Sequence, residues 1–496
     1  MSPQEPIATR QPAGLQPTRP MPAWLRHPAR AGVVFLIIFI AALFGIFTRP
    51  VGFLAAVWPA NAILLGMMLR WKGTSGPAGW LGAALGYVLA DYLTGSPLDV
   101  SLWMTAANMA GVAVGVLLLR RLTPAQLALT RSSGVLALAG TALAVATVGA
   151  GLGCQAEAVL FGRSPVEAFG NWFGADLLNV MAILPVILTM PERLGASSAP
   201  PALPPRPERR RRPPIPRLEE VAPWRWAPAA ALALSLLATV LVGGAGALTF
   251  PVPALLWCAL RYRPFGTAVL VLVSALAMVL MVSAGHVHLA PAIPREDMIS
   301  IRIGITLTAL APLTVVAVTA SREELMERLH HAATHDGLTG TLARTAFMEK
   351  ARALTDRLAG EGRPAAVITV DADHFKRVND NWGHPAGDRV LARLAGVMQA
   401  SLRREDLLGR IGGEEFAMLL ADVDGVEARR IAVRLLDAIR GVEVPLGPGG
   451  EAYCGSASLG VALVTPDGAG LEAALAAADR AMYRAKQNGR NRVEMA

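Results

Sequence analysis

The chain has 496 residues, of which 53% are hydrophobic and 17% are charged, and its mean hydropathy is +0.44. Soluble domains usually carry about 25% charged residues, so this composition excludes a protein that is soluble throughout. The formal net charge is +9. Because arginines beside apolar segments account for much of this excess, we expect no nucleic-acid partner. The three widely separated cysteines, Cys154, Cys258 and Cys454, are expected to be small buried hydrophobic residues.

The charges are distributed unevenly along the chain. Residues 1–31 contain several Pro and Arg and no cleavage site behind a short apolar core, so we expect a disordered cytoplasmic tail and not a signal peptide. Residues 32–320 hold few charges and are expected to form a membrane domain. We expect a juxtamembrane helix at 321–333 and a soluble domain at 334–496.

Ten apolar segments of the membrane domain are predicted to cross the bilayer, which takes about 20 residues in a helix. Arg and Lys gather in alternate loops between these segments. Because positive charge marks cytoplasmic loops, this pattern places both termini in the cytoplasm. Pro251 and Pro253 predict a broken or tilted eighth segment. The segments lie near 32–48, 51–69, 77–93, 101–119, 134–154, 168–190, 226–244, 247–261, 265–284 and 299–320.

Two features of this domain go beyond its hydrophobicity. Residues 191–223 form a Pro- and Arg-rich stretch, which we expect to be an extended cytoplasmic loop along anionic lipid headgroups. Polar side chains inside apolar spans are costly and therefore informative. Two interpretations of them stay open, namely hydrogen bonds between helices or a polar ligand pocket. These side chains are Asn61, Asp91, Asn108, Asn171, Asp176 and Asn179.

Three stretches of this half carry a family resemblance: "VWPANAILLGMMLR" (57–70), "NWFGADLLNVMAILPVIL" (171–188) and "FPVPALLWCALRYRPFG" (250–266). They resemble the MASE-type membrane-associated sensors found ahead of bacterial signalling outputs. The resemblance covers about residues 30–320. It implies a sensor in the inner membrane that responds to a small-molecule or membrane stimulus, which it does not name.

From about residue 334 the pattern changes to alternating strands and helices. The run 364–371 is expected to be a buried strand, and "LLGRIGGEEFAMLL" (407–420) two strands around a tight glycine turn. The order β-α-β-β-α-β is the ferredoxin-like plan. The predicted fold is therefore a multi-span helical membrane domain followed by an α+β ferredoxin-like domain. Helices are expected at 386–402, 426–440 and 471–489, the last closed by Gly489, and a further strand at 453–464.

Acidic and basic residues gather at one edge of this plan. Asp371 ends the first strand, and Glu414 lies in the hairpin that the plan places beside it. Carboxylates at one edge bind Mg²⁺, which prefers hard oxygen ligands and substrate phosphates. The cations available for a triphosphate are Lys376, Arg410, Lys486 and Arg490.

"GGEEF" (412–416) stands among further motifs: "DADHFKRVNDNWGHPAGD" (371–388), "RRED" (403–406), "SLG" (458–460) and "AMYRAKQNGRNRV" (481–493). In this order they closely resemble the GGDEF diguanylate cyclases, over about residues 332–496. The resemblance implies condensation of two GTP into cyclic di-GMP by a homodimer in which each subunit holds one GTP.

The same resemblance implies roles for individual residues. Asp371, the carbonyl of Ala372, and Glu414 would hold two Mg²⁺ (or Mn²⁺) ions per active site. Asn379 and Asp388 would read the guanine edge. The residues implied in phosphate binding are Lys376, Arg410, Gly412, Gly413, Lys486 and Arg490, and those implied in catalysis are Asp371, Lys376, Glu414 and Glu415, the last near the ribose 3′-hydroxyl.

Arg403 and Asp406 match the family's Arg-x-x-Asp pattern for an inhibitory product site. Arg434, on the following helix, would complete a grip on cyclic di-GMP. The alternative is a surface ion pair between Arg403 and Asp406, which would contribute about 0–1 kcal/mol.

The segment "DGLTGTLARTAF" (336–347) departs from the family at Thr341, Ala343 and Thr345, where Leu, Asn and Arg are usual. This departure bears on the stability or regulation of that segment more than on the chemistry. The alternative function is a catalytically silent membrane receptor for GTP or cyclic di-GMP. Because the metal-binding acids and the glycines are all present, we expect an active enzyme.

Overall fold

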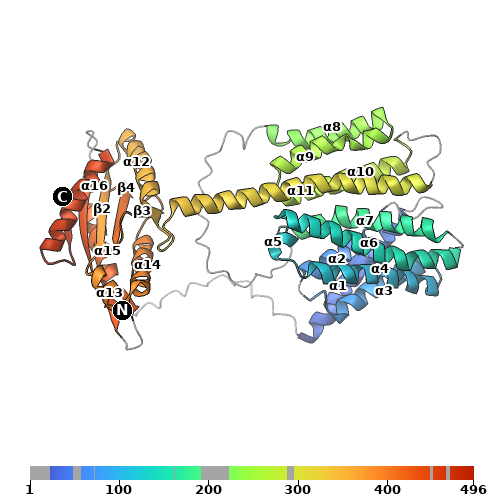
Figure 1. The fold of residues 1–496 in the computed structure, drawn as a ribbon, viewed down its shortest axis with the longest axis horizontal. Helices are drawn as coiled ribbons and strands as arrows, with labels where there is room; N and C mark the ends of the chain where they lie inside the picture. The colour runs from blue at the N-terminus through green and yellow to red at the C-terminus, as the bar shows by residue number, and fades with distance from the viewer. Residues whose placement is uncertain are drawn as a thin grey trace, which may run out of the picture. The chain divides into compact units, whose positions relative to one another are not determined.

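The computed structural model describes residues 23–48, 57–71, 73–161, 164–191, 223–287, 295–446, 451–464 and 470–496. Contacts within the chain define two compact units, Met1–Glu323 and Glu324–Ala496 (Figure 1). Most of the predicted tail, 1–22, and of the Pro/Arg-rich loop, 192–222, lies outside the described residues.

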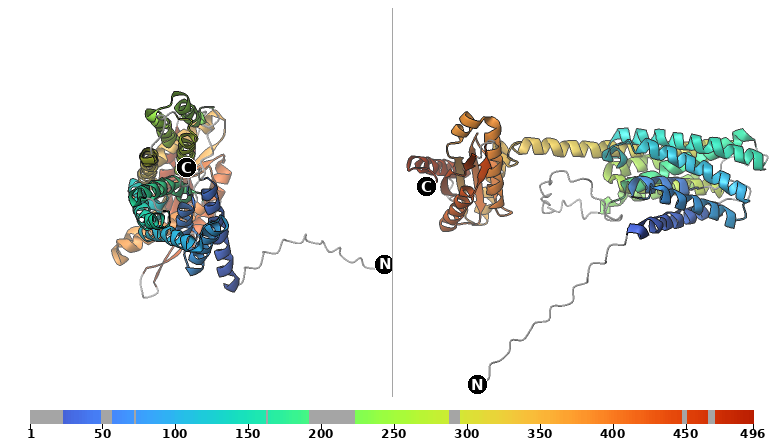
Figure 2. Two further views of the ribbon diagram at one scale, coloured as in Figure 1. Left: turned by 90° about the vertical axis from the view of Figure 1, so that its right-hand side faces the viewer. Right: turned by 90° about the horizontal axis from the view of Figure 1, so that it is seen from below.

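The first unit consists of helices that run side by side (Figures 1 and 2). A helix lies at each of the ten places where an apolar segment predicted one. The elements are α1 (Ala23–Phe47), α2 (Ala60–Arg70), α3 (Pro77–Leu93), α4 (Leu98–Leu119), α5 (Pro124–Leu127), α6 (Ser132–Phe161), α7 (Pro165–Thr189), η3 (Pro223–Arg225), α8 (Ala227–Val242), η4 (Ala245–Thr249), α9 (Pro251–Arg261), α10 (Pro264–Ser283) and α11 (Arg295–Thr334).

Six helices in the described part of the chain are long and apolar enough to cross a membrane, which indicates a membrane protein. Helices α2, α8 and α9 are apolar but shorter. In the eighth segment the helix type changes from the 3₁₀ helix η4 to the α-helix α9, which begins at Pro251. The six long stretches are Pro28–Phe47, Leu98–Leu119, Ser132–Ala156, Pro165–Thr189, Pro264–Ser283 and Ile299–Thr334.

Polar side chains of this unit bond to one another between helices. Asn61 on α2 donates from Nδ2 to Oδ1 of Asn108 on α4 and to Oδ1 of Asp176 on α7, both at 3.0 Å. Its own Oδ1 accepts the hydroxyl of Tyr87 on α3 at 2.7 Å and the indole N–H of Trp58 at 3.3 Å. Of the two interpretations, hydrogen bonding between helices is the one that these contacts support.

Helix α11 is a single helix of 40 residues that continues past Glu323, where the first unit ends. The predicted juxtamembrane helix 321–333 is therefore the last part of α11 and continues the last predicted span without a break. Three large apolar side chains of this part are more than half exposed: Leu325, Met326 and Leu329.

The second unit is built on a six-stranded sheet in the order β1-β3-β4-β2-β7-β8, beside a two-stranded sheet of β5 and β6. The four middle strands pair antiparallel, as the ferredoxin-like plan requires. Buried clusters lie on both faces, and β2 is buried along its whole length. The elements are β1 (Leu342–Ala343), α12 (Arg344–Gly360), β2 (Ala365–Ala372), α13 (Phe375–Trp382), α14 (His384–Ala400), β3 (Leu407–Arg410), β4 (Glu415–Ala421), α15 (Gly425–Arg440), β5 (Glu443–Pro445), β6 (Ala452–Cys454), β7 (Ala457–Val464), α16 (Gly470–Gln487) and β8 (Val493–Met495).

The predicted strand 453–464 is wrong in one respect, because the chain forms two strands there. A Cβ at Gly455 would lie 1.8 Å from the carbonyl oxygen of Ile439, so the chain passes close to α15 between β6 and β7. The prediction of three buried cysteines is also wrong for Cys454, although Cys154 and Cys258 are buried. In β6 the alternation of side chains turns Tyr453 inward and therefore Cys454 outward.

Candidate active site

The carboxylates predicted to meet at one sheet edge do so. Asp371, next to last in β2, is directly opposite Glu415 at the start of β4. The backbone N–H of Ala372 donates to the carbonyl oxygen of Glu414 at 3.4 Å. On its other side β2 pairs with β7, which places Ser458 opposite Asp371. The end of β2 and the start of β4 thus bring the side chains of the GGEEF motif and Asp371 to the same edge.

Burial and neighbouring negative charge together shape the electrostatics at this edge. Asp371 is 4% exposed, and its Oδ2 lies 2.6 Å from the ammonium of Lys486 on α16. Burial raises the pKa of Asp371, while the hydrogen bond from Lys486 opposes the rise. Burial and the neighbouring Asp371 raise the pKa of Glu414. One lysine therefore balances more than one carboxylate, and the edge favours a further cation.

These groups fit a magnesium site. Asp371, Glu414 and the carbonyl of Ala372 offer hard oxygen donors at one edge, and the Lys486 ammonium lies against Asp371 as a positive charge. Within the described ranges, no three His, Cys, Asp or Glu side chains form a ready metal-binding group. Phosphate oxygens of a substrate would complete the coordination, as Mg²⁺ usually requires.

The two glycines of the GGEEF hairpin have different surroundings. The N–H groups of Ile411 and Gly412 both donate to the carbonyl of Glu415, at 2.9 and 3.3 Å. A Cβ at Gly412 would lie 2.5 Å from Oε2 of Glu415, whereas a Cβ at Gly413 would meet nothing within 4 Å. A Cβ at Gly412 would therefore displace the end of the flexible Glu415 side chain, and the space around Gly413 is open to an approaching group.

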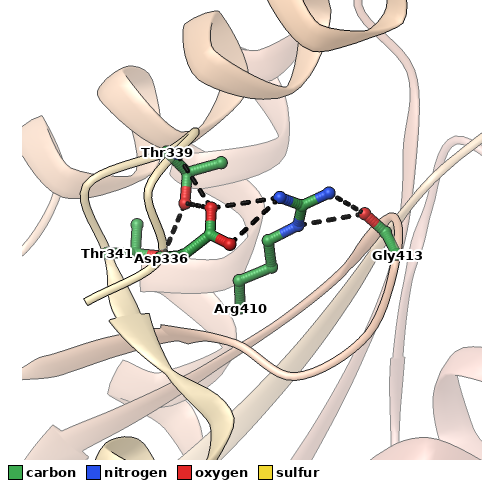
Figure 3. Close-up of polar contacts among 5 residues, drawn as sticks. All are labelled: Asp336, Thr339, Thr341, Arg410 and Gly413. Atoms are coloured by element: carbon green, nitrogen blue, oxygen red, sulfur yellow. Dashed lines mark hydrogen bonds and ion pairs between the residues drawn. The ribbon is translucent and has the colours of Figure 1, made fainter. Parts of the chain in front are cut away.

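Arg410 has contacts that the sequence did not predict (Figure 3). Its Nη1 lies 3.0 Å from Oδ1 and 3.2 Å from Oδ2 of Asp336, and its Nε donates to the carbonyl of Gly413 at 3.0 Å. Thr339 donates to Asp336 from its N–H and its hydroxyl, and the Thr339 and Thr341 hydroxyls are 2.9 Å apart. Burial would raise the pKa of Asp336, but the hydrogen bonds from Thr339 and Arg410 hold it below its usual value.

This ion pair joins the segment before β1 to the GGEEF hairpin. Thr341, one of the departures from the family pattern, fits next to this ion pair. Its side chain is 3% exposed, and its hydroxyl is hydrogen-bonded to the hydroxyl of Thr339. The signal in the sequence was the "DGLTG" stretch, in which an aspartate followed by Gly and Thr favours a side-chain-stabilised turn. Its distant partner, Arg410, had no signal in the sequence.

The two residues predicted to read guanine lie on adjacent helices. Asn379 is on α13 and Asp388 on α14, which pack together. The Oδ1 atom of Asn379 is buried and has no hydrogen-bond partner among the described residues. A Cβ at Gly387 would lie 2.0 Å from this Oδ1, so glycine beside Asp388 is what lets Asn379 take its position. Sequence reasoning missed Gly387. An unpaired buried acceptor is open to an N–H donor.

Two further cations, Lys376 and Arg490, are predicted to bind phosphate. Lys376, in the first turn of α13, and Arg490, just after α16, are both exposed. Gly489 has φ +110° and ends α16 as predicted. The cations thus come from three separate elements, α13, β3 and the end of α16.

The predicted product-site residues lie on the turn before β3 and on α15. Asp406 is 4% exposed, and its carboxylate accepts the N–H of Arg403 at 2.7 Å and of Ala421 at 3.1 Å. The guanidinium of Arg403 lies 3.6 Å from Glu427 on α15. The ion pair of Arg403 is therefore with Glu427, and the alternative pairing with Asp406 is wrong. Arg434, further along α15, is exposed.

Part of the chain matches a known protein family. Residues 333–492 match the family described as "Diguanylate cyclase, GGDEF domain". A probable diguanylate cyclase, DgcF, of Escherichia coli strain K12 is 32% identical over 280 residues, 53% of this chain and 84% of that protein. The chain belongs to the GGDEF diguanylate cyclase family. Its similarity to the DgcF of Escherichia coli O157:H7, 28% identical, extends over 92% of this chain and 93% of that protein.

The chain is also similar to solved structures of GGDEF proteins. The GGDEF domain of DgcB from Caulobacter crescentus in complex with c-di-GMP is 30% identical, with 33% of this chain and 93% of that chain covered and a TM-score of 0.32. A sensory box/GGDEF family protein from the same organism is 38% identical, with 32% and 100% covered and a TM-score of 0.30.

Proposed function

We propose that this membrane protein is an active diguanylate cyclase that condenses two GTP into cyclic di-GMP and two pyrophosphates. The observation that carries the proposal is the sheet edge where Asp371 and Glu414 meet beside Lys486. The unpaired acceptor on Asn379 adds a reason for a guanine substrate. The GGEEF motif contains both glycines and two acidic residues, so none of its residues would prevent the reaction.

In the proposed mechanism the chain binds and orients two GTP. Asn379 and Asp388 accept hydrogen bonds from the guanine edge, which adenine does not match. In each step the 3′-hydroxyl of one GTP attacks the α-phosphorus of the other, the bond to pyrophosphate breaks, and the hydroxyl proton leaves. Two Mg²⁺ (or Mn²⁺) ions, when bound by Asp371, Ala372 and Glu414, would neutralise charge on the phosphates.

Phosphates of the substrate would be held by cations and by the open hairpin turn. Lys376 and Arg490 are exposed and would be available to bind phosphate oxygens. Lys486 would exchange its contact with Asp371 for a phosphate when the metal ions enter. Glu415, opposite Asp371 in the sheet, would face the ribose 3′-hydroxyl.

The reaction needs two GTP-loaded copies facing each other, so we propose a homodimer. The exposed Leu325, Met326 and Leu329 near the end of α11 offer an apolar stripe for a second copy. Because this helix continues the last predicted span, the membrane domain would set the register of the two cyclase domains. The stimulus is a small molecule or a property of the bilayer.

The proposed location is the inner membrane, with ten spans and both termini in the cytoplasm. Support comes from the ten helices at the predicted places and from positive charge in alternate loops. GTP is a cytoplasmic substrate, and this orientation places the cyclase unit with it.

We further propose that cyclic di-GMP binds at Arg403, Asp406 and Arg434 and slows the enzyme. The exposed guanidinium groups of Arg403 and Arg434 would grip phosphate and guanine. Arg403→Ala should keep the initial rate near that of the parent and lose the slowing as product accumulates. A mutant that slows as much as the parent, or a parent that never slows at micromolar product, would refute this site.

The experiment for the main proposal uses the full chain purified in detergent micelles or nanodiscs. Incubation with GTP and Mg²⁺ should yield one cyclic di-GMP for every two pyrophosphates, and EDTA should stop the reaction. ATP should give no cyclic product. Binding of GTP without turnover under any metal condition would favour the silent receptor instead.

A further inference from the structure

The turn that follows α16 has an unusual backbone. Gly489, Arg490 and Asn491 have φ values of +110°, +61° and +48° in succession. Glycine adopts positive φ readily, whereas residues with a side chain do so uncommonly, Arg less often than Asn. Two such residues in a row persist only where surrounding contacts fix them. The turn carries Arg490, one of the proposed phosphate-binding cations.

Asp373 fixes this turn from the inside. Its Oδ2 accepts the backbone N–H of Asn491 at 3.0 Å and the hydroxyl of Ser456 at 2.6 Å. Its Oδ1 accepts the hydroxyl of Ser458 at 2.7 Å. Asp373 is 2% exposed, and its own N–H donates to the carbonyl of Ser456. One buried carboxylate therefore joins the end of β2, the start of β7 and the turn after α16.

Arg440, the last residue of α15, fixes the turn from the outside. Its Nε donates to Oδ1 of Asn491 at 3.0 Å, and its Nη2 donates to the carbonyl oxygen of Asn491 at 2.9 Å. Its third nitrogen, Nη1, bonds to Asp437 on the same helix. The N–H, the carbonyl and the side chain of Asn491 are all held, by residues from two different elements.

The site geometry gives this turn a functional place. Four residues before Arg490, Lys486 contacts Asp371, and one residue after it Asn491 contacts Asp373. The end of α16 is thus tied twice to the end of β2, at both aspartates. We propose that Asp373 and Arg440 are positioning residues that hold the strained turn and thereby present Arg490 to the GTP phosphates. This inference rests on the proposed function, since it takes Arg490 as a phosphate ligand.

The test measures nucleotide binding and not turnover. The probe is 3′-deoxy-GTP with Mg²⁺, because without its 3′-hydroxyl the bound nucleotide cannot condense. Isothermal titration of the full chain in nanodiscs compares the parent with Arg440→Ala. Loss of the hydrogen bonds from this exposed arginine should weaken binding about threefold to tenfold. Asp437→Ala removes the other partner of Arg440 and is the matched control, with unchanged affinity expected.

A double-mutant cycle separates positioning from a general loss of stability. If Arg440 acts through Arg490, then Arg440→Ala should have little further effect on binding in an Arg490→Ala background. An undiminished effect in that background, or no effect in the parent, would overturn the positioning role alone. A parent that binds no 3′-deoxy-GTP would overturn the proposed function as well.

Asp373 is tested by a pair of substitutions. In Asp373→Asn the amide oxygen can still accept from Asn491 and Ser456 while the amide nitrogen donates to the Ser458 hydroxyl, so affinity should stay within about threefold of the parent. Asp373→Ala leaves three donors unpaired and should weaken binding more than Arg440→Ala does. Equal affinity for the two variants would contradict the role assigned to Asp373. If Asp373→Ala does not fold, the Arg440 cycle decides.

Discussion

The membrane unit and the cyclase unit each contain an aspartate that is buried to the same degree, but the groups in contact with the two carboxylates differ. Asp176 and Asp371 are both 4% exposed. Asp176 receives an amide N–H from Asn61, and its second oxygen has no hydrogen-bond partner among the described residues. Asp371 faces the ammonium of Lys486, and nearby carboxylates contribute to the rise in its pKa.

The difference separates a polar contact that holds helices together from one that is poised for a ligand. Around Asn61, the Asn108 amide, the Tyr87 hydroxyl and the Asp176 carboxylate come from neighbouring helices, and the Trp58 indole lies just before α2. At the cyclase edge the groups are carboxylates, which repel each other, and Lys486 is the cation in contact with Asp371. Several carboxylates around a single lysine therefore indicate a cation site better than one buried aspartate does.

The largest effect should come from removing one charge at the cyclase edge. Glu414→Gln keeps the shape of the side chain and removes a proposed metal ligand, so cyclic di-GMP synthesis should fall by about 10²-fold or more. Chromatographic quantification of the product checks this. Glu349→Gln, an exposed carboxylate on α12, is the matched control and should retain the parent rate. A near-parent rate for Glu414→Gln would remove the basis for the metal assignment.

The membrane cluster should respond in stability. Asn61→Ala leaves the Tyr87 hydroxyl and two acceptors without their common partner, so the free energy of unfolding should fall by about 2 kcal/mol. Thermal unfolding of the full chain in detergent measures this as a lower midpoint. Asn171→Ala is the control, because the backbone carbonyl of Asn171 is the group that accepts from Arg302. Equal midpoints for the two variants would mean that the cluster contributes nothing.

The guanine-reading acceptor should be sensitive to one methyl group. Gly387→Ala would place a Cβ 2.0 Å from Oδ1 of Asn379 and displace it. We expect the preference for GTP over ATP in kcat/KM to fall about tenfold, as for loss of one well-placed polar contact. Gly396→Ala, on the same helix α14, meets nothing within 4 Å and should leave the preference unchanged. An unchanged preference in Gly387→Ala would place guanine recognition elsewhere.

The smallest effect concerns the ion pair of Asp336 and Arg410. Because the pKa of folded Asp336 lies below its ordinary value of 3.8, its ionised form stabilises the fold above that value. The stabilisation is lost as the pH falls through the folded pKa. The unfolding midpoint of Asp336→Asn should therefore lie below that of the parent at about pH 6 and approach it at about pH 3. Asp380→Asn, an exposed control, should follow the parent, and a pH-independent gap for Asp336→Asn would be the contrary result.

Local patterns predicted the elements that carry the site. Apolar length placed the ten helices of the first unit, and strand and turn patterns placed β2 and the GGEEF hairpin. These predictions succeed because the hydrophobic period and the turn residues act within a few positions of one another. They fail where the backbone of another element packs closely against the chain. At Gly455, between β6 and β7, the carbonyl of Ile439 lies so close that a Cβ would not fit, and the predicted strand is interrupted there.

The order of residues along the chain was enough to predict which acidic, basic and glycine residues gather at the cyclase edge, and that this edge forms at the end of β2 and the start of β4. Which distant partners hold those residues follows from the packing of the folded chain. Arg410 pairs with Asp336 across 74 positions, Asn61 with Asp176 across 115, and Asn491 with Asp373 across 118. Such contacts form when packed strands and helices bring distant segments together, and no local spacing encodes them.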